Sequence, residues 1–184
     1  MTDITDNRLA RLRQRVAGTD TDLVALGPSS HMQWLLGLNP HGDERPVMAL
    51  VTADKAAVLM PKLNADAARA QCNNVPFYEW SDTDGPLDAL TALLTDFDVK
   101  RPGISVALDE MMRADFAFLL LDQLEAPIRR FKQDTLGQLR AEKDADEHKL
   151  LRDCAGLNDT VFELAFASLR TGMSENDVKT IIVD

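Results

Sequence analysis

The segment RPVMALVTADKAAVLMP, from Arg45 to Pro61, contains two apolar runs typical of buried strands. Only Ala53 and Asp54 separate the two runs. A connection this short joins antiparallel neighbours, because a parallel pair needs a crossover of about a dozen residues or more. The segment therefore predicts an antiparallel hairpin.

On both sides of this hairpin, helical patterns alternate with short apolar runs. The pattern predicts strands at 22–27, 75–80, 102–108 and 127–131, and helices at 7–17, 28–38, 64–72, 85–97 and 113–124. A hairpin embedded in such an alternation predicts a mixed sheet covered by helices. The expected fold class is α/β, with three α/β/α layers, and the first domain is expected to span residues 1–134.

The remainder, residues 135–184, has a different pattern. One helical pattern runs from Asp144 to Leu169 with a wide apolar stripe. Gly172 is expected to end this helix, and Ser174 with Asp177 is expected to cap another. The apolar pattern of that second helix is interrupted at the last residue. We therefore expect the chain to carry the first two helices of a truncated second domain.

Composition excludes several classes of protein. The chain has 184 residues, of which 45% are hydrophobic and 27% charged, as in a globular protein with a real core. Its net charge of −10 argues against nucleic acid as a partner, since phosphate binding needs a basic surface. No apolar run approaches the roughly 20 residues that span a membrane, and the N-terminal residues lack the apolar core of a signal peptide. No membrane partner is expected, and a cytoplasmic location is the default.

The search for catalytic motifs finds no HExxH, GxSxG, GxGxxG or Walker sequence. His31, His41 and His148 lack the helical spacing of metal ligands, and His31 is interpreted as a capping or partly buried residue. The segment GLNPHGDERP, Gly37 to Pro46, concentrates polar and ionisable groups between two prolines. Both a solvated turn and a recognition loop fit this composition. Trp80 ends a predicted strand and is expected at the rim of the core rather than inside it.

Four segments together carry a family resemblance: WLLGLNP, the hairpin, ISVALDEMM, and the junction that begins LRAEKDADEHKLLRD. The junction resembles a Leu-Arg-x-x-Lys sequence, then Glu and Leu-Arg on a long helix, then Gly-x-Ser/Thr-Glu. Its matching residues are Leu139, Arg140, Lys143, Glu147, Leu151, Arg152, Gly172, Ser174 and Glu175. The chain thus resembles the creatinase/prolidase N-terminal domain and the entry into the pita-bread metallopeptidase fold, and the HGDERP sequence favours a bacterial member.

The resemblance implies a ribonuclease H-like N-terminal domain of an Xaa-Pro peptidase, of the aminopeptidase P or Xaa-Pro dipeptidase kind. Such a parent enzyme hydrolyses peptide bonds that precede or follow proline. It uses two divalent metal ions, Mn²⁺ or Co²⁺, held by two Asp, one His and two Glu of the pita-bread domain. The resemblance assigns no catalytic residue, metal ligand or cofactor to the 184 residues themselves.

In the resembling enzymes, N-terminal loops help to form the homo-oligomer and border the active-site entrance. The implied partners are a second copy, as in a dimer, and proline-containing peptides for the parent. The substrate-entrance residues that this role implies here are Asn39, His41, Asp43, Arg45 and Trp80.

An alternative function is a stand-alone, non-catalytic binding module for peptides or proteins, of the pseudo-peptidase kind. The interrupted apolar helix after Ser174 favours the first function over this alternative.

Overall fold

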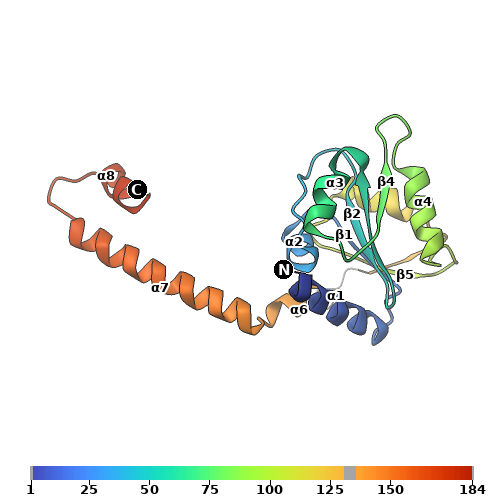
Figure 1. The fold of residues 1–184 in the computed structure, drawn as a ribbon, viewed down its shortest axis with the longest axis horizontal. Coiled ribbons are helices and arrows are strands. Elements are labelled where there is room, and N and C mark those ends of the chain that lie inside the picture. The colour runs from blue at the N-terminus through green and yellow to red at the C-terminus, as the bar shows by residue number, and fades with distance from the viewer. Residues whose placement is uncertain (1, 131–135, 184) are drawn as a thin grey trace. The chain divides into compact units, whose positions relative to one another are not determined.

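The computed structural model describes residues 2–130 and 136–183 (Figure 1). The chain divides into two compact units, Met1–Ala141 and Glu142–Asp184. Helix α6 (Leu136–Ala141) belongs to the first unit, since Leu136 and Leu139 are buried there. The division thus follows α6, whereas the sequence pattern places it at residue 134. That the second unit begins a pita-bread domain stays a prediction.

The first unit contains a six-stranded sheet with the strand order β4-β3-β2-β1-β5-β6. The strands are β1 (Leu23–Leu26), β2 (Met48–Val51), β3 (Ala56–Pro61), β4 (Phe77–Trp80), β5 (Ser105–Leu108) and β6 (Ile128–Arg130). Strand β2 is antiparallel to both of its neighbours, and every other pairing is parallel. The predicted hairpin is confirmed: Val51 pairs with Ala56, and the Thr52 N–H donates to the Lys55 carbonyl at 2.9 Å.

Helices cover both faces of this sheet. They are α1 (Thr2–Ala17), α2 (Ser30–Leu36), α3 (Lys62–Gln71), α4 (Leu87–Asp96) and α5 (Ala114–Leu121). In β1, Val24 and Leu26 join one buried cluster, with side chains of α1, α2, α3 and α6. Leu23 and Ala25 join the other cluster, with side chains of α4 and α5. Both faces of β1 are therefore apolar, and the predicted three-layer α/β/α fold is confirmed.

The second unit consists of α7 (Ala145–Ser168) and α8 (Glu175–Val183). Asp144 caps α7 in a reciprocal capping box with Glu147, with bonds of 2.8 and 3.1 Å. Ser174 and Asp177 cap α8 in the same way, as the sequence predicts. The long helix is therefore confirmed to within one residue at each end, and its start is fixed by side chains of its own first turn.

Most large apolar side chains of α7 are exposed, and Ala165 is the residue of this helix that is buried. Phe162 and Phe166 contact each other with ring centroids 5.3 Å apart, although 62% and 63% of their surfaces remain exposed. Together with Val178 and Ile182 of α8 they line an apolar cavity of about 260 Å³. Helix α8 therefore covers only part of the apolar surface of α7.

No helix among residues 2–130 and 136–183 combines the length and the apolar composition needed to cross a lipid bilayer.

Candidate functional site

The candidate site lies at the edge of the sheet where the parallel strands end. Because β2 alone runs in the opposite direction, β1, β3, β4 and β5 all finish at this edge and β2 begins there. The loops that meet at the edge are residues 27–29, 37–47, 81–86 and 109–113. Open α/β sheets bind ligands in the crevice outside the carboxyl ends of their strands. The topology thus brings the Gly37–Pro46 loop to the edge where a binding site is expected.

The Gly37–Pro46 loop is held at both of its ends. At its start, Gly37 ends α2 in the left-handed conformation, with φ of 73°, which a residue with a side chain adopts at a cost. At its end, the Trp80 Nε1–H donates to the Pro46 carbonyl at 3.0 Å. The loop is therefore attached to the sheet through the last residue of β4.

Arg45 ties the same loop to the segment after β4. Its Nε and Nη2 groups donate to the two carboxylate oxygens of Asp82 at 2.9 and 3.1 Å. This bidentate bond raises the pKa of Arg45 and lowers the pKa of Asp82. Within the loop, the Arg45 N–H also donates to Asp43 Oδ1 at 2.9 Å, which closes a tight turn. The fork geometry fixes the direction of the Arg45 side chain as well as its position.

Asn39 and His41, in the first half of the loop, lie near the segment that follows β1. They line a polar cavity of about 360 Å³ together with Pro28, Ser29 and Ser30, which follow β1. Asn39 and His41 are exposed, whereas Arg45 is half-buried against Asp82. The structure therefore brings two of the predicted site residues into one cavity and places Asp43 and Arg45 outside its lining.

Asp43 and Glu44 lie near the loop after β5. The pKa of Arg113 is raised, first by its hydrogen bonds to Asp115 and also by the charges of Asp115, Asp43 and Glu44. Asp43 and Glu44 of the Gly37–Pro46 loop are therefore close enough to Arg113, just before α5, for their charges to raise its pKa.

The prediction for Trp80 at the rim of the core is wrong. Only 7% of its surface is exposed, and its ring packs in the core cluster with α4 and α5. The polar end of the indole satisfies its hydrogen bond inside the protein, at the Pro46 carbonyl. Trp80 therefore anchors the Gly37–Pro46 loop to the core through a hydrogen bond to the loop backbone.

The site also contains a group of side chains that sequence reasoning missed. His31 Nδ1 lies 2.5 Å from Asp109 Oδ1, and His31 Nε2 lies 3.8 Å from Glu110 Oε1. His31 is 7% exposed, so its interpretation as partly buried understates its burial. The pairing of β1 with β5 brings these residues together, because the Asp109 N–H donates to the Ala25 carbonyl at 2.9 Å. No local spacing reveals a partner 78 positions away.

His31, Asp109 and Glu110 form the one group within residues 2–130 and 136–183 whose side chains have a geometry able to hold a metal ion. The resemblance implies five ligands, two Asp, one His and two Glu, for a pair of ions. This group of three does not fit that set, and no peptidase step is assigned to it.

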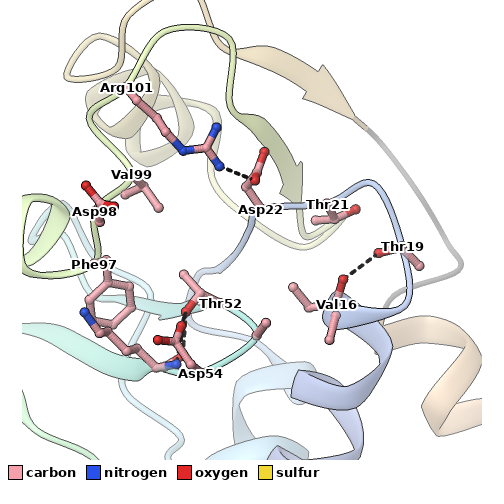
Figure 2. A pocket seen from close by; sticks show the side chains of 13 residues that line it. Val16, Thr19, Thr21, Asp22, Thr52, Asp54, Phe97, Asp98, Val99 and Arg101 are labelled. Atoms are coloured by element: carbon pink, nitrogen blue, oxygen red, sulfur yellow. Dashed lines mark hydrogen bonds and ion pairs between the residues drawn. The ribbon is translucent and has the colours of Figure 1, made fainter.

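A second cavity, of about 470 Å³, lies at the opposite edge of the sheet (Figure 2). Arg101 bonds Asp22 there at 2.5 Å, and Thr52 donates to Asp54 at 2.8 Å, which lowers the pKa of Asp54. Figure 2 shows both pairs among the side chains that line the cavity. Asp22, Arg101 and Asp54 thus each have a partner within the fold, so this cavity is the weaker candidate for a binding site.

The fold matches a known domain family and several solved structures. The model of the creatinase/prolidase N-terminal domain matches residues 8–126. No curated protein matches the chain. Among solved structures, the chain is similar to dipeptidase PepE from Mycobacterium ulcerans, with a TM-score of 0.84 and 22% identity over 99% of this chain and 50% of that one.

A dipeptidase from Pyrococcus horikoshii OT3 gives a TM-score of 0.81 and 23% identity, over 95% of this chain and 48% of its own. The N-terminal domain of an Xaa-Pro dipeptidase from Lactobacillus brevis gives 0.62 and 18%, over 73% of this chain and 98% of its own. The chain thus spans about half the length of the two longer structures and resembles them across both of its units. Because the family model covers more than half of its residues, the chain belongs to the creatinase/prolidase N-terminal domain family.

Proposed function

We propose that these 184 residues are the non-catalytic N-terminal part of a metal-dependent Xaa-Pro peptidase. The similarity to dipeptidase structures over 95–99% of this chain, but only 48–50% of theirs, carries this proposal. The similarity also covers α7 and α8, which lie outside the sheet domain. These two helices would not be expected in a stand-alone sheet domain. In this proposal the two divalent ions, Mn²⁺ or Co²⁺, bind in a pita-bread domain outside these residues.

Within that enzyme, we assign the Gly37–Pro46 loop to the substrate entrance. The bonds of Arg45 to Asp82 and of Trp80 to Pro46 support this role, since a loop that positions a substrate must itself be held. Asn39 and His41 then present polar groups from the cavity wall to a proline-containing peptide. Asp43 and Arg45 orient the loop, and Trp80 anchors it.

The purified 184-residue chain is expected to show no cleavage of an Xaa-Pro dipeptide, with or without added Mn²⁺ or Co²⁺. The reason is that the described residues contain a single group of three possible ligands rather than a five-residue set. Release of free proline from a dipeptide, measured with the chain in excess, checks this expectation. Metal-dependent turnover by the pure chain would overturn the assignment of catalysis to another domain.

In the full-length peptidase, His41→Ala and Arg45→Ala are each expected to lower kcat/KM by about fivefold to tenfold. The melting temperature should stay within about two degrees, because exposed loop residues contribute little to stability. Arg101→Ala is the matched control: it removes an Arg–Asp pair at the opposite sheet edge and should leave kcat/KM unchanged. Full activity in both loop variants would mean that the loop is only a solvated turn.

A further inference from the structure

His31, Asp109 and Glu110 form a second candidate site, which does not depend on the proposed peptidase function. His31 comes from the first turn of α2, and the two acidic residues come from the loop after β5. Their possible ligand atoms all lie within 4.8 Å of one another. The side chains of His31 and Asp109 are 8% and 2% exposed, whereas that of Glu110 is 38% exposed. The group is therefore a buried pair that opens to solvent on the side of Glu110.

Among the described residues, no lysine or arginine side chain forms an ion pair with the carboxylates of this group. The side-chain neighbours of the Asp109 carboxylate are His31 and the Ser29 hydroxyl, whose Oγ lies 3.2 Å from Oδ2 and 3.1 Å from the Gly27 carbonyl oxygen. Glu110 has His31 as its charged neighbour. Buried charges in proteins are paired or bind metals, and here two carboxylates share one imidazole.

The two ring nitrogens of His31 have different surroundings, and Nε2 has no hydrogen-bond donor or acceptor within bonding distance among the described residues. A carboxylate only accepts hydrogen bonds, so Nδ1 of His31 donates to Asp109 and a neutral ring leaves the lone pair of Nε2 free. Nε2 lies 3.8 Å from Glu110 Oε1, a second acceptor. This separation is too long for a hydrogen bond. Zinc binds nitrogen at about 2.1 Å and carboxylate oxygen at about 2.1 Å, so one ion touches both atoms when they are less than about 4.2 Å apart.

We propose that His31 Nε2 and Glu110 Oε1 bind one divalent transition-metal ion, and that Asp109 orients the imidazole. Metal-binding histidines commonly donate their other ring N–H to a carboxylate, which fixes the tautomer, and Asp109 occupies that place here. Ser29 in turn holds the second oxygen of Asp109. A mixed nitrogen and oxygen ligand pair favours Zn²⁺, Ni²⁺ or Co²⁺ over Mg²⁺ or Ca²⁺. Water fills the remaining positions on the exposed side, and the ion links the first turn of α2 to the loop after β5.

Zinc titration of the 184-residue chain, prepared without an affinity tag, tests this site. Calorimetry should show one Zn²⁺ per chain, and about 0.1 mM Zn²⁺ should raise the melting temperature by about 2 °C or more, reversibly with EDTA. Glu110→Gln keeps the size of a partly exposed side chain and should weaken binding about tenfold or more. His41→Gln is the matched control, because it removes an exposed histidine that is not in the group, and should bind zinc as before.

Imidazole nitrogen NMR of the unmodified chain gives a readout that needs no variant. Saturating Zn²⁺ should shift the Nε2 signal of the histidine whose Nδ1 is protonated, and should leave the other two histidines in place. Zinc binding that survives in Glu110→Gln but is lost in His41→Gln would overturn the proposal. So would a chain whose melting temperature and histidine signals do not respond to zinc.

Discussion

At tens of micromolar, the purified 184-residue chain is expected to be a dimer held together by α7. Leu157, Phe162 and Leu164 expose 67%, 62% and 63% of their surfaces, and α8 covers only part of this helix. Burying one large apolar side chain is worth about 1.5–3 kcal/mol. A second copy offers the simplest cover, since a two-fold contact brings the same surface together twice. Sedimentation or light scattering should therefore report twice the 20.4 kDa mass of the chain.

Phe162→Glu should break this dimer. A two-fold contact loses the burial of the side chain in both copies, about 3–6 kcal/mol in total, which weakens dimerisation on the order of a hundredfold to ten-thousandfold. Leu63→Glu is the matched control, because Leu63 is an equally apolar and exposed residue, at 79%, on α3 of the first unit. A monomer with a fully formed α7 at these concentrations would show that this apolar surface does not self-associate.

His31→Leu is expected to destabilise the first unit by about 3 kcal/mol or more, because it removes the Nδ1–H that donates to the buried Asp109 carboxylate and leaves the Ser29 hydroxyl beside its other oxygen. Such a loss is about a fifth or more of the stability of an ordinary domain, which is about 5–15 kcal/mol. Chemical unfolding followed by circular dichroism measures it. A loss of this size is typical of a broken buried hydrogen-bond network and exceeds the loss expected from a surface contact.

A double variant that also replaces Asp109 shows whether the loss in His31→Leu comes from the buried carboxylate. Adding Asp109→Leu to His31→Leu removes the unpaired charge, so the double variant should be more stable than His31→Leu alone. Arg45→Leu breaks an exposed Arg–Asp pair and should lose far less than His31→Leu, since exposed pairs contribute little. A double variant less stable than His31→Leu would show that Asp109 is not a buried charge in need of a partner.

Features encoded within a few residues could be predicted from the sequence. The hairpin follows from the two residues between its apolar runs, and the starts of α7 and α8 follow from Asp144 and Ser174. Helix α6 was not predicted, because its six residues are too few to show an apolar period. Local patterns therefore determine which elements form and where they begin.

Contacts between distant segments could not be predicted in the same way. The bond from Arg45 to Asp82 and the pair of His31 with Asp109 depend on which strands are neighbours, and β1 lies beside β5 rather than β3. Trp80 is in the core because α4 and α5 cover that face, which the end of a strand does not reveal. The recognition loop was found from its composition, and the cavity that Asn39 and His41 line depends on the loop after β1.

The central claim is that these residues belong to a longer Xaa-Pro peptidase. It is tested most directly by measuring the mass and activity of the polypeptide that contains them in its native cells. An antibody raised against the 184-residue chain captures this polypeptide, whose mass and activity on Xaa-Pro dipeptides are then measured. The proposal predicts a chain about twice as long, in line with the solved structures, that hydrolyses the bond at proline, loses activity in EDTA and regains it with Mn²⁺ or Co²⁺. A captured polypeptide that shows no such hydrolysis under any of these conditions would contradict the proposal and favour a non-catalytic binding module.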